Sequence, residues 1–221
     1  MLIGLNGRLK SGKDTTYAII KELRPEAERV SFAGKLKEAA AASIGTTVEA
    51  LELLKGREDL LLEFTDQGFD TGFPPYNFKP FNVRQYLQWF GTEGHREVFG
   101  DNFWVDQALP LDLDHSDRLL VVTDMRFPNE AQRVLDLGGI TAKVEREVET
   151  GHGAHASEQN IDDMCQRRID NTGTLEDLRL RVAIFLSAIT PRATTIEESK
   201  AHGKQLMEDT DKAIGFISGR K

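Results

Sequence analysis

Short apolar runs alternate with longer amphipathic stretches along most of this sequence, and the alternation predicts its strands and helices. Apolar runs bounded by turn residues predict buried strands, and apolar positions at helical spacing predict helices that bury one face. The first strand ends at Gly7, and the helix after it stops before Pro25. The expected strands are 2–6, 29–32, 119–123, 140–144 and 168–170, and the expected helices are 13–23, 34–44, 82–100, 103–109, 128–137 and 174–189.

The order of these elements predicts an α/β fold, because a chain that alternates strands with helices forms a parallel sheet with helices on both faces. Residues 46–81 break the alternation with a charged, helix-like stretch over 47–64 and then a loop rich in Gly, Pro, Phe and Asp, which we interpret as an insertion. Residues 196–217 predict a separate C-terminal helical tail. The polar stretch 145–160 is expected to be a mobile loop.

Composition and charge narrow the class of protein. The chain has 221 residues, a formal net charge of −8 and a pI near 5.2, which argues against a general nucleic-acid binder because such proteins cluster Lys and Arg. Its one cysteine, Cys165, excludes an internal disulfide and favours a reducing compartment. Residues 1–6 lack a basic leader, and no apolar run approaches the about 18 residues of a membrane helix, so we expect a cytoplasmic protein with no membrane partner.

The segment after the first strand has the Gly-x-x-x-x-Gly-Lys pattern of a P-loop, formed by Gly7, Gly12 and Lys13. Glycines let backbone N–H groups turn toward a polyphosphate, the lysine neutralises the β- and γ-phosphates, and the next helix offers its positive N-terminus. Three fixed positions arise by chance in roughly 5% of chains of this length. The strand before the loop and the helix after it favour a phosphate-binding loop over a turn without a ligand.

One position departs from the usual loop. Asp14 follows Lys13 where most P-loops have the Ser or Thr that holds Mg²⁺, and Thr15 comes one residue later. Either Asp14 binds the metal, directly or through water, or it orders the loop. A second acid, Asp124, follows the third expected strand, where P-loop enzymes place an acid for the Mg²⁺ shell or the substrate. Asp124 and the nearby Arg126 could instead form a surface ion pair.

Several blocks of this sequence resemble, in the same order, the deoxynucleoside monophosphate kinases of tailed bacteriophages. The resemblance covers roughly residues 1–48 and 82–188, and the family's loop ends in Gly-Lys-Asp-Thr, so Asp14 is expected there. The matching blocks are Gly7 to Thr16, Phe32 to Glu38, Val83 to Glu93, Phe103 to Val105, Asp124 to Glu130 with Gly138 and Gly139, His155 to Glu158, and Asn171 to Leu178.

This resemblance implies transfer of the ATP γ-phosphate to a deoxynucleoside monophosphate (dNMP), with Mg²⁺, and it assigns residues by position. The ATP site would comprise Gly7, Lys10, Ser11, Gly12, Lys13, Asp14, Thr15, Asn171, Gly173 and Thr174. The acceptor site would comprise Lys35, Arg84, Gln88, Trp104, Asp124 and Arg126. The transferring group would meet Lys13, Arg126 and Arg146, and the candidate Mg²⁺ ligands are Asp14, Thr15 and Asp124.

The resemblance also divides the chain into parts. Residues 1–190 would form a P-loop kinase domain with an acceptor-binding insertion at about 46–100 and a lid at about 145–160, and residues 191–221 would form the tail. The tail could cover its own domain or a second subunit, and we favour a homodimer.

Some of these residues have simpler interpretations. Gln88 and Trp104 have helical spacing among apolar neighbours and could belong to the core or its margin. Residues 171–174 could be only a helix cap, with Thr174 as N-cap and Asp177 at the capping-box position.

Two other functions are compatible with the loop. One is another small-molecule P-loop kinase, of the dephospho-coenzyme A kinase or phosphomevalonate kinase type. The other is a non-enzymatic module that uses ATP to drive assembly on nucleic acid, which the acidic balance disfavours. Residues 49–81 differ from the family and could shape a different acceptor pocket.

Overall fold

The structure is a computed structural model that describes residues 1–62, 81–115, 117–146, 161–190, 204 and 207–208. The chain divides into two compact units. Unit 1 consists of residues 1–31 and 108–221, and unit 2 of residues 32–107. Each unit has its own hydrophobic core.

Unit 1 is built on a five-stranded parallel sheet with the strand order β2-β5-β1-β6-β7. The central strand β1 (Leu2–Asn6) pairs with β5 (Leu120–Val122) on one side and with β6 (Ile140–Glu145) on the other. The edges are β2 (Glu28–Val30) and β7 (Arg167–Asp170). A parallel sheet flanked by helices confirms the expected α/β fold, which is consistent with a P-loop kinase.

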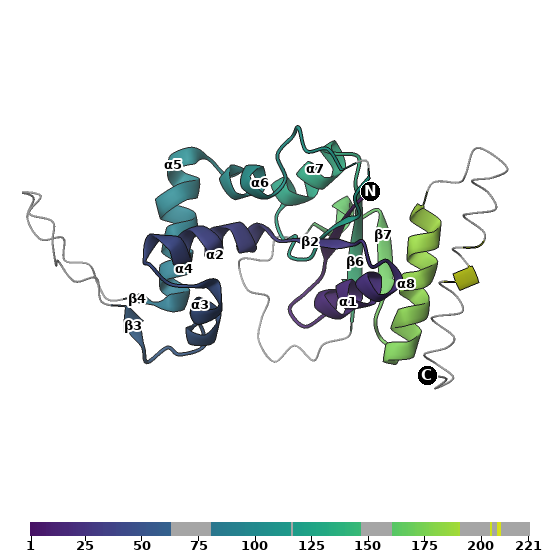
Figure 1. Cartoon of the computed structure of the whole chain (residues 1–221), viewed down its shortest axis with the longest axis horizontal. Coiled ribbons are helices and arrows are strands. Elements are labelled where there is room, and N and C mark those ends of the chain that lie inside the picture. The colour runs from purple at the N-terminus through teal and green to yellow at the C-terminus, as the bar shows by residue number, and fades with distance from the viewer. Residues whose placement is uncertain (63–80, 116, 147–160, 191–203, 205–206, 209–221) are drawn as a thin grey trace, which may run out of the picture. The chain divides into compact units, whose positions relative to one another are not determined.

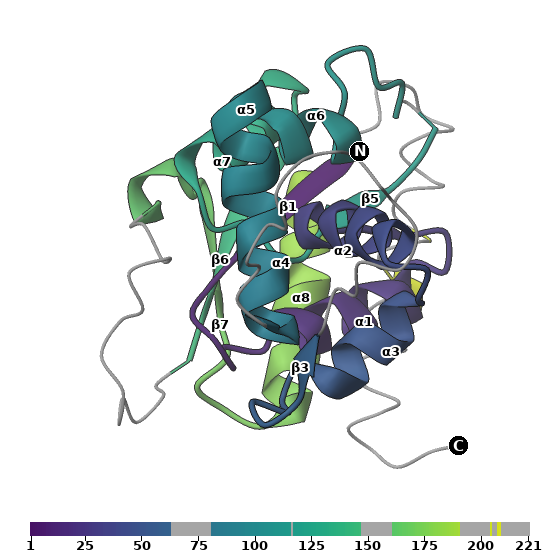
Figure 2. The ribbon, with the colours of Figure 1, turned by 90° about the vertical axis from the view of Figure 1, so that its left-hand side faces the viewer.

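Helices cover both faces of this sheet. Two of them, α1 and α8, lie side by side on one face, as Figures 1 and 2 show, and α7 packs against β1 and β6. Side chains of β1 alternate between the faces, because Ile3 and Leu5 join the core beneath α1 and α8 whereas Gly4 lies against Val134 of α7. The bounds of these helices are Lys13–Leu23 for α1, Pro128–Asp136 for α7 and Leu175–Ile189 for α8.

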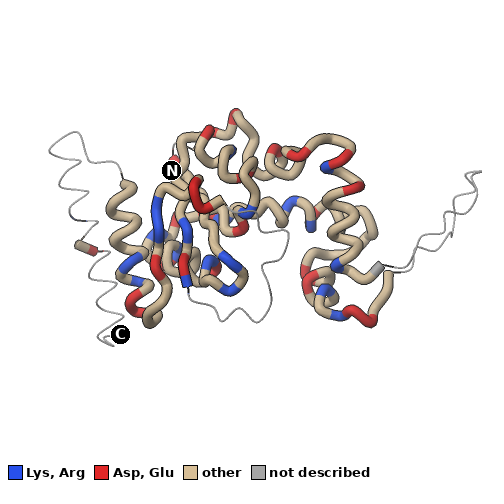
Figure 3. Tube along the Cα trace, turned by 180° about the vertical axis from the view of Figure 1, so that it is seen from behind, with Lys and Arg blue, Asp and Glu red and all other residues tan. Residues whose placement is uncertain are grey.

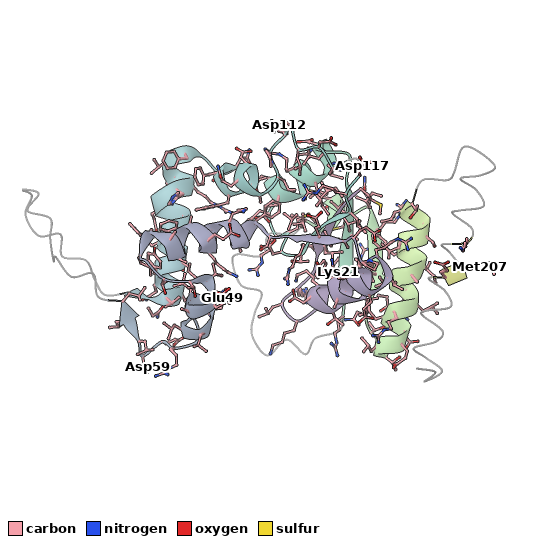
Figure 4. The ribbon with its side chains drawn as sticks, viewed as in Figure 1. Lys21, Glu49, Asp59, Asp112, Asp117 and Met207 are labelled. Atoms are coloured by element: carbon pink, nitrogen blue, oxygen red, sulfur yellow. The ribbon has the colours of Figure 1, made fainter. Side chains whose placement is uncertain are left out.

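Local signals fix the ends of these helices. The hydroxyl of Thr174 accepts from Asp177 N at 3.2 Å, and Asp177 Oδ2 accepts from Thr174 N at 2.9 Å, which confirms the expected capping box of α8. Gly138 follows α7 with φ 71°, a conformation that favours glycine. Lys21 of α1, labelled in Figure 4, donates to Pro25 O at 2.7 Å and closes the turn toward β2.

Unit 2 is mainly helical. Its core contains Leu51, Val83, Tyr86 and Leu87, and the phenol of Tyr86 donates to Ala40 O at 2.9 Å. One short antiparallel pair joins β3 to β4. The elements are α2 (Phe32–Ser43), α3 (Val48–Leu54), β3 (Leu61–Leu62), β4 (Phe81–Asn82), α4 (Val83–Gly91), a π-helical turn (Thr92–Arg96), α5 (Glu97–Phe99) and α6 (Phe103–Ala108).

The helix expected over 47–64 was wrong in its extent. Thr47 caps α3 by accepting from Ala50 N at 3.2 Å, but the helix ends at Leu54, shortly before Gly56. Glycine disfavours helix, and the chain then turns toward β3. Acidic and basic residues are interspersed along both units (Figure 3). The charge pattern of the sequence therefore does not show where α3 ends.

Two other expected boundaries are corrected. The strand expected over 29–32 ends at Val30, because Phe32 already begins α2 and is buried. The helix expected over 82–100 is interrupted by the π-helical turn, where the ring Nδ1 of His95 lies 2.6 Å from Phe90 O. A side chain that bonds a helix carbonyl replaces one backbone bond and allows the wider turn.

Parts of three expected features lie outside the described residues. These are the loop of the insertion over 63–80, the loop beyond Arg146 and nearly all of the C-terminal tail, in which residues 204, 207 and 208 are described as helical. Within the described part of the chain, no helix is long and apolar enough to cross a membrane.

Candidate active site

In unit 1, the residues predicted to bind the nucleotide lie at the carboxyl ends of the sheet strands. The connection after β1 leads to β2 on one side, and the connection after β6 leads to β7 on the other, so a topological switch point lies between β1 and β6. Ligands of open α/β sheets bind at such a point. The segments at this edge are residues 7–15 after β1, Asp124 to Arg126 after β5, Arg146 after β6 and residues 171–174 after β7.

The P-loop has backbone conformations that favour glycine. Gly7 and Gly12 have φ of 153° and 100°, and Lys10 lies between them with φ 64°. A Cβ on Gly7 would lie 2.6 Å from Val144 O, and a Cβ on Gly12 would collide with the side-chain amide of Asn171. Both the backbone angle and the surrounding space therefore require glycine at these two positions.

Two polar side chains hold the loop in shape. Asn171 is 7% exposed, and its Nδ2 donates to Ser11 O at 2.8 Å. Lys13 Nζ donates to Gly7 O and, at 3.1 Å, to Arg8 O. The ammonium group of Lys13 thus lies at the loop itself, where it can neutralise a bound polyphosphate.

Two hydroxyls also favour a ligand at this loop. Ser11 Oγ and Thr16 Oγ1 are buried and have no hydrogen-bond partner among the described residues. Buried hydroxyls in folded proteins usually have one. Together with the backbone of the loop and the N-terminus of α1, these groups fit the phosphate chain of a nucleotide.

Asp14 forms an ion pair that sequence reasoning missed. Its Oδ1 accepts from Arg29 Nη2 of β2. Arg29 Nε also donates to Thr123 Oγ1 at 2.8 Å, and the guanidinium carbon lies 5.7 Å from the ring centroid of Tyr17. No sequence motif marks an arginine in a short edge strand as the partner of the acid after Lys13.

The candidate Mg²⁺ ligands do not form a closed cage. Among the described residues, no group of three or more His, Cys, Asp and Glu side chains could hold a metal ion by itself. Mg²⁺ at nucleotides usually takes only one or two protein groups, with phosphates and waters as its other ligands. Asp14 and Thr15 are exposed, and Asp124 Oδ2 accepts from Ser31 Oγ at 2.8 Å, so this set fits a nucleotide-bound ion.

The turn after β5 is shaped by a buried carboxylate. Glu130 is 3% exposed, and its Oε2 accepts from the backbone N–H groups of Arg126 at 2.6 Å and Phe127 at 3.0 Å. Asn6 Nδ2 donates to Met125 O at 3.1 Å and ties this turn to the end of β1. The side chain of Arg126 is exposed at this edge of the sheet.

The turn after β7 is also well defined. Asn171 N donates to Glu145 O at 2.7 Å, which joins the ends of β7 and β6. The hydroxyl and N–H of Thr172 donate to Asp170 Oδ1 at 2.7 and 2.9 Å, and they hold the pKa of Asp170 below its ordinary value. Arg146 is exposed beyond β6, and Gly173 and Thr174 are exposed before α8.

The remaining predicted residues lie in unit 2. Lys35 on α2 is exposed, and Arg84 and Gln88 are exposed one turn apart on α4. Trp104 is 3% exposed, and its Nε1 donates to Gly91 O at 3.0 Å. The structure therefore places Trp104 in the interior of unit 2, where it holds the last residue of α4.

Comparisons with known proteins found a distant sequence relative and a structural neighbour. No family model matches the sequence. Among curated proteins, the chain is 27% identical over 179 residues to "Deoxynucleoside-5'-monophosphate kinase" of Escherichia phage T5, with 60% of this chain and 70% of that protein covered. Among solved structures, it matches TT1252 from Thermus thermophilus with 18% identity and a TM-score of 0.46, covering 86% of this chain and 98% of that one. The chain is thus distantly similar to a kinase of deoxynucleoside monophosphates.

Proposed function

We propose that this protein is a deoxynucleoside monophosphate kinase that transfers the γ-phosphate of ATP to a dNMP and yields a dNDP. The observation that carries the proposal is the P-loop at the end of β1, where Gly7, Gly12 and Lys13 have the backbone and charge that a nucleotide polyphosphate needs. The distant similarity to the phage T5 protein supports a dNMP as the acceptor class.

The donor site is proposed to lie at the carboxyl edge of the unit 1 sheet. The N–H groups of residues 10–15 bind the phosphates of ATP, and Lys13 neutralises the β- and γ-phosphates. The turn 171–174 lies beside the adenine, and Asn171 keeps this turn attached to the P-loop. Arg126 and Arg146 stabilise the charge on the transferring phosphoryl group.

The acceptor site is proposed to use residues of the insertion at about 46–100 and of α2. Arg84 and Lys35 bind the acceptor phosphate, because a guanidinium can bond a phosphate with two parallel N–H groups. Gln88 contacts the nucleoside from the same face of α4. Trp104 contributes by fixing Gly91 at the end of this helix.

The chemistry is an in-line transfer between two phosphates without a covalent enzyme intermediate. The acceptor is already an anion, so no general base is required, and positioning with cation stabilisation supplies most of the rate. Mg²⁺ held near Asp14, Thr15 or Asp124 would neutralise the β- and γ-phosphate oxygens. Asp124 orders the Mg²⁺ water or an arginine at this site.

An acceptor panel tests this proposal. The protein is incubated with MgATP and, in separate reactions, each dNMP, each ribonucleoside monophosphate, dephospho-coenzyme A and phosphomevalonate, and the products are separated by chromatography. We expect a dNDP and ADP in equal amounts with at least one dNMP. Phosphorylation of only one of the last two acceptors would replace the proposal with the rival kinase, and ATP binding without transfer would favour a module that is not an enzyme.

A further inference from the structure

Arg29 is held in place by groups that do not belong to the P-loop. Its Nε donates to Thr123 Oγ1 at 2.8 Å, and Thr123 is only 2% exposed at the end of β5. Its guanidinium also lies over the ring of Tyr17. A planar cation that is bonded at Nε and lies over a ring on one side has a restricted orientation, so it presents Nη2 in one direction.

Asp14, which accepts from Arg29 Nη2, is more exposed than Arg29. The side chain of Asp14 is 78% exposed, compared with 48% for Arg29, and it lies in the first turn of α1. Asp14 Oδ1 accepts from Arg29 Nη2, whereas Oδ2 has no partner within the described part of the chain. The fixed guanidinium therefore selects one orientation of the carboxylate and leaves its second oxygen available.

We infer that Arg29 is a positioning residue that directs Asp14 toward the nucleotide-bound Mg²⁺, an inference that rests on the proposed function. Carboxylates that bind metals are commonly oriented by a hydrogen bond from a second residue. The alternative is that Arg29 competes with the metal for Asp14. Its anchoring by Thr123 and Tyr17 disfavours competition, because these contacts do not depend on Asp14.

The test is the Mg²⁺ dependence of ATP binding, measured by isothermal titration calorimetry on the full chain. For each variant, the Kd for ATP in EDTA is divided by the Kd for ATP in saturating Mg²⁺, which gives the gain that the metal provides. We expect Arg29→Met to reduce this gain about 10- to 100-fold, the range found when residues that orient metal ligands are removed. A substitution that only weakens the fold would raise both Kd values together.

Arg118→Met is the matched control. Arg118 forms an exposed ion pair with Glu28, the residue of β2 next to Arg29, and has a similar side-chain exposure of 45%. Its loss should leave the gain unchanged. Thr123→Val removes the oxygen that anchors Arg29 while keeping both charges, so it should reduce the gain partly and provides a second route to the same result.

Each outcome has one meaning. An unchanged gain in Arg29→Met would overturn the positioning role, and an increased gain would show that Arg29 competes with the metal. Equal weakening of ATP binding in EDTA and in Mg²⁺ would also overturn it, because the gain that the metal provides would then be unchanged. Wild-type protein that does not bind ATP in either buffer would instead overturn the proposed function and, with it, this inference.

Discussion

At the scale of single residues, the P-loop is specified by backbone angle and by long-range contact together. Gly12 has φ 100°, and the space where a Cβ would project is filled by the side chain of Asn171. Asn171 cannot easily move away, since it is buried and its Nδ2 is bonded to Ser11 O. Gly12 and Asn171 are far apart in the sequence, but each therefore depends on the other for the shape of the loop.

A comparison of Gly12→Ala with Gly138→Ala separates the effect of the backbone angle from the effect of the contact with Asn171. Gly138 has φ 71° and open space around its Cβ position, so alanine there adds only backbone strain of about 1–2 kcal/mol. At Gly12 the collision with Asn171 should add about 1–3 kcal/mol to the loss of unfolding free energy. Urea denaturation measures both variants, and equal losses would contradict the contact with Asn171.

At this scale, the sequence predicted some residues of the candidate site but not all of them. It identified Lys13 and Gly12 because their spacing is local, and it identified Asn171 only through resemblance. It missed Arg29, whose partners lie on other elements, Asp14 on helix α1 and Thr123 just after β5. Such a contact depends on strand register and on side-chain direction, which the order of residues does not reveal.

At the scale of elements, the start of α8 shows how a local signal becomes structure. Thr174 and Asp177 exchange hydrogen bonds across the first turn, and the turn 171–174 that precedes it touches the P-loop through Asn171. This capping box was predictable because its residues are three apart. The π-helical turn after α4 was not, because it depends on a bond between the His95 ring and Phe90 O.

The capping box should give α8 a stability that depends on pH. Hydrogen bonds from Thr174, chiefly from its N–H, lower the pKa of Asp177, so the carboxylate stabilises the folded state above the unfolded pKa of about 3.9. This contribution is lost as pH falls through the lower pKa of the folded state. Asp177→Ala should therefore melt below wild type at pH 7, with a difference that narrows below about pH 4. A difference that is constant over this range in calorimetric melts would contradict the role of the ionised carboxylate.

At the scale of the whole molecule, the proposed donor and acceptor residues belong to different units. The P-loop and Asn171 lie in unit 1, and Lys35, Arg84 and Gln88 lie in unit 2. The sequence predicted the parallel sheet of unit 1 from its alternating strands and helices. It did not show that the second unit begins as early as Phe32, because the helix that starts there continues the same α/β pattern.

Substitutions in unit 2 should therefore separate the two substrates. Arg84→Ala should raise the KM for the dNMP about 10- to 100-fold, because a hydrogen bond to a charged group contributes about 1.5–3 kcal/mol. The KM for ATP should change little. Arg57→Ala, which removes an exposed arginine of unit 2 paired with Asp59, is the control and should leave both constants unchanged. Steady-state kinetics decide the matter, and a change in the ATP constant alone would show that Arg84 does not serve the acceptor.

The most direct test of the central claim is the transfer of labelled γ-phosphate from ATP to a dNMP by wild-type protein and by Lys13→Ala. We expect wild type to form labelled dNDP and the variant to lose at least about 100-fold in rate, since electrostatic stabilisation of a transferring group is typically worth this much. Both proteins should remain folded without nucleotide, which their thermal melting curves measure, because Lys13 is only partly buried and donates to the loop carbonyls of Gly7 and Arg8. Full transfer activity in a folded Lys13→Ala protein would contradict the account.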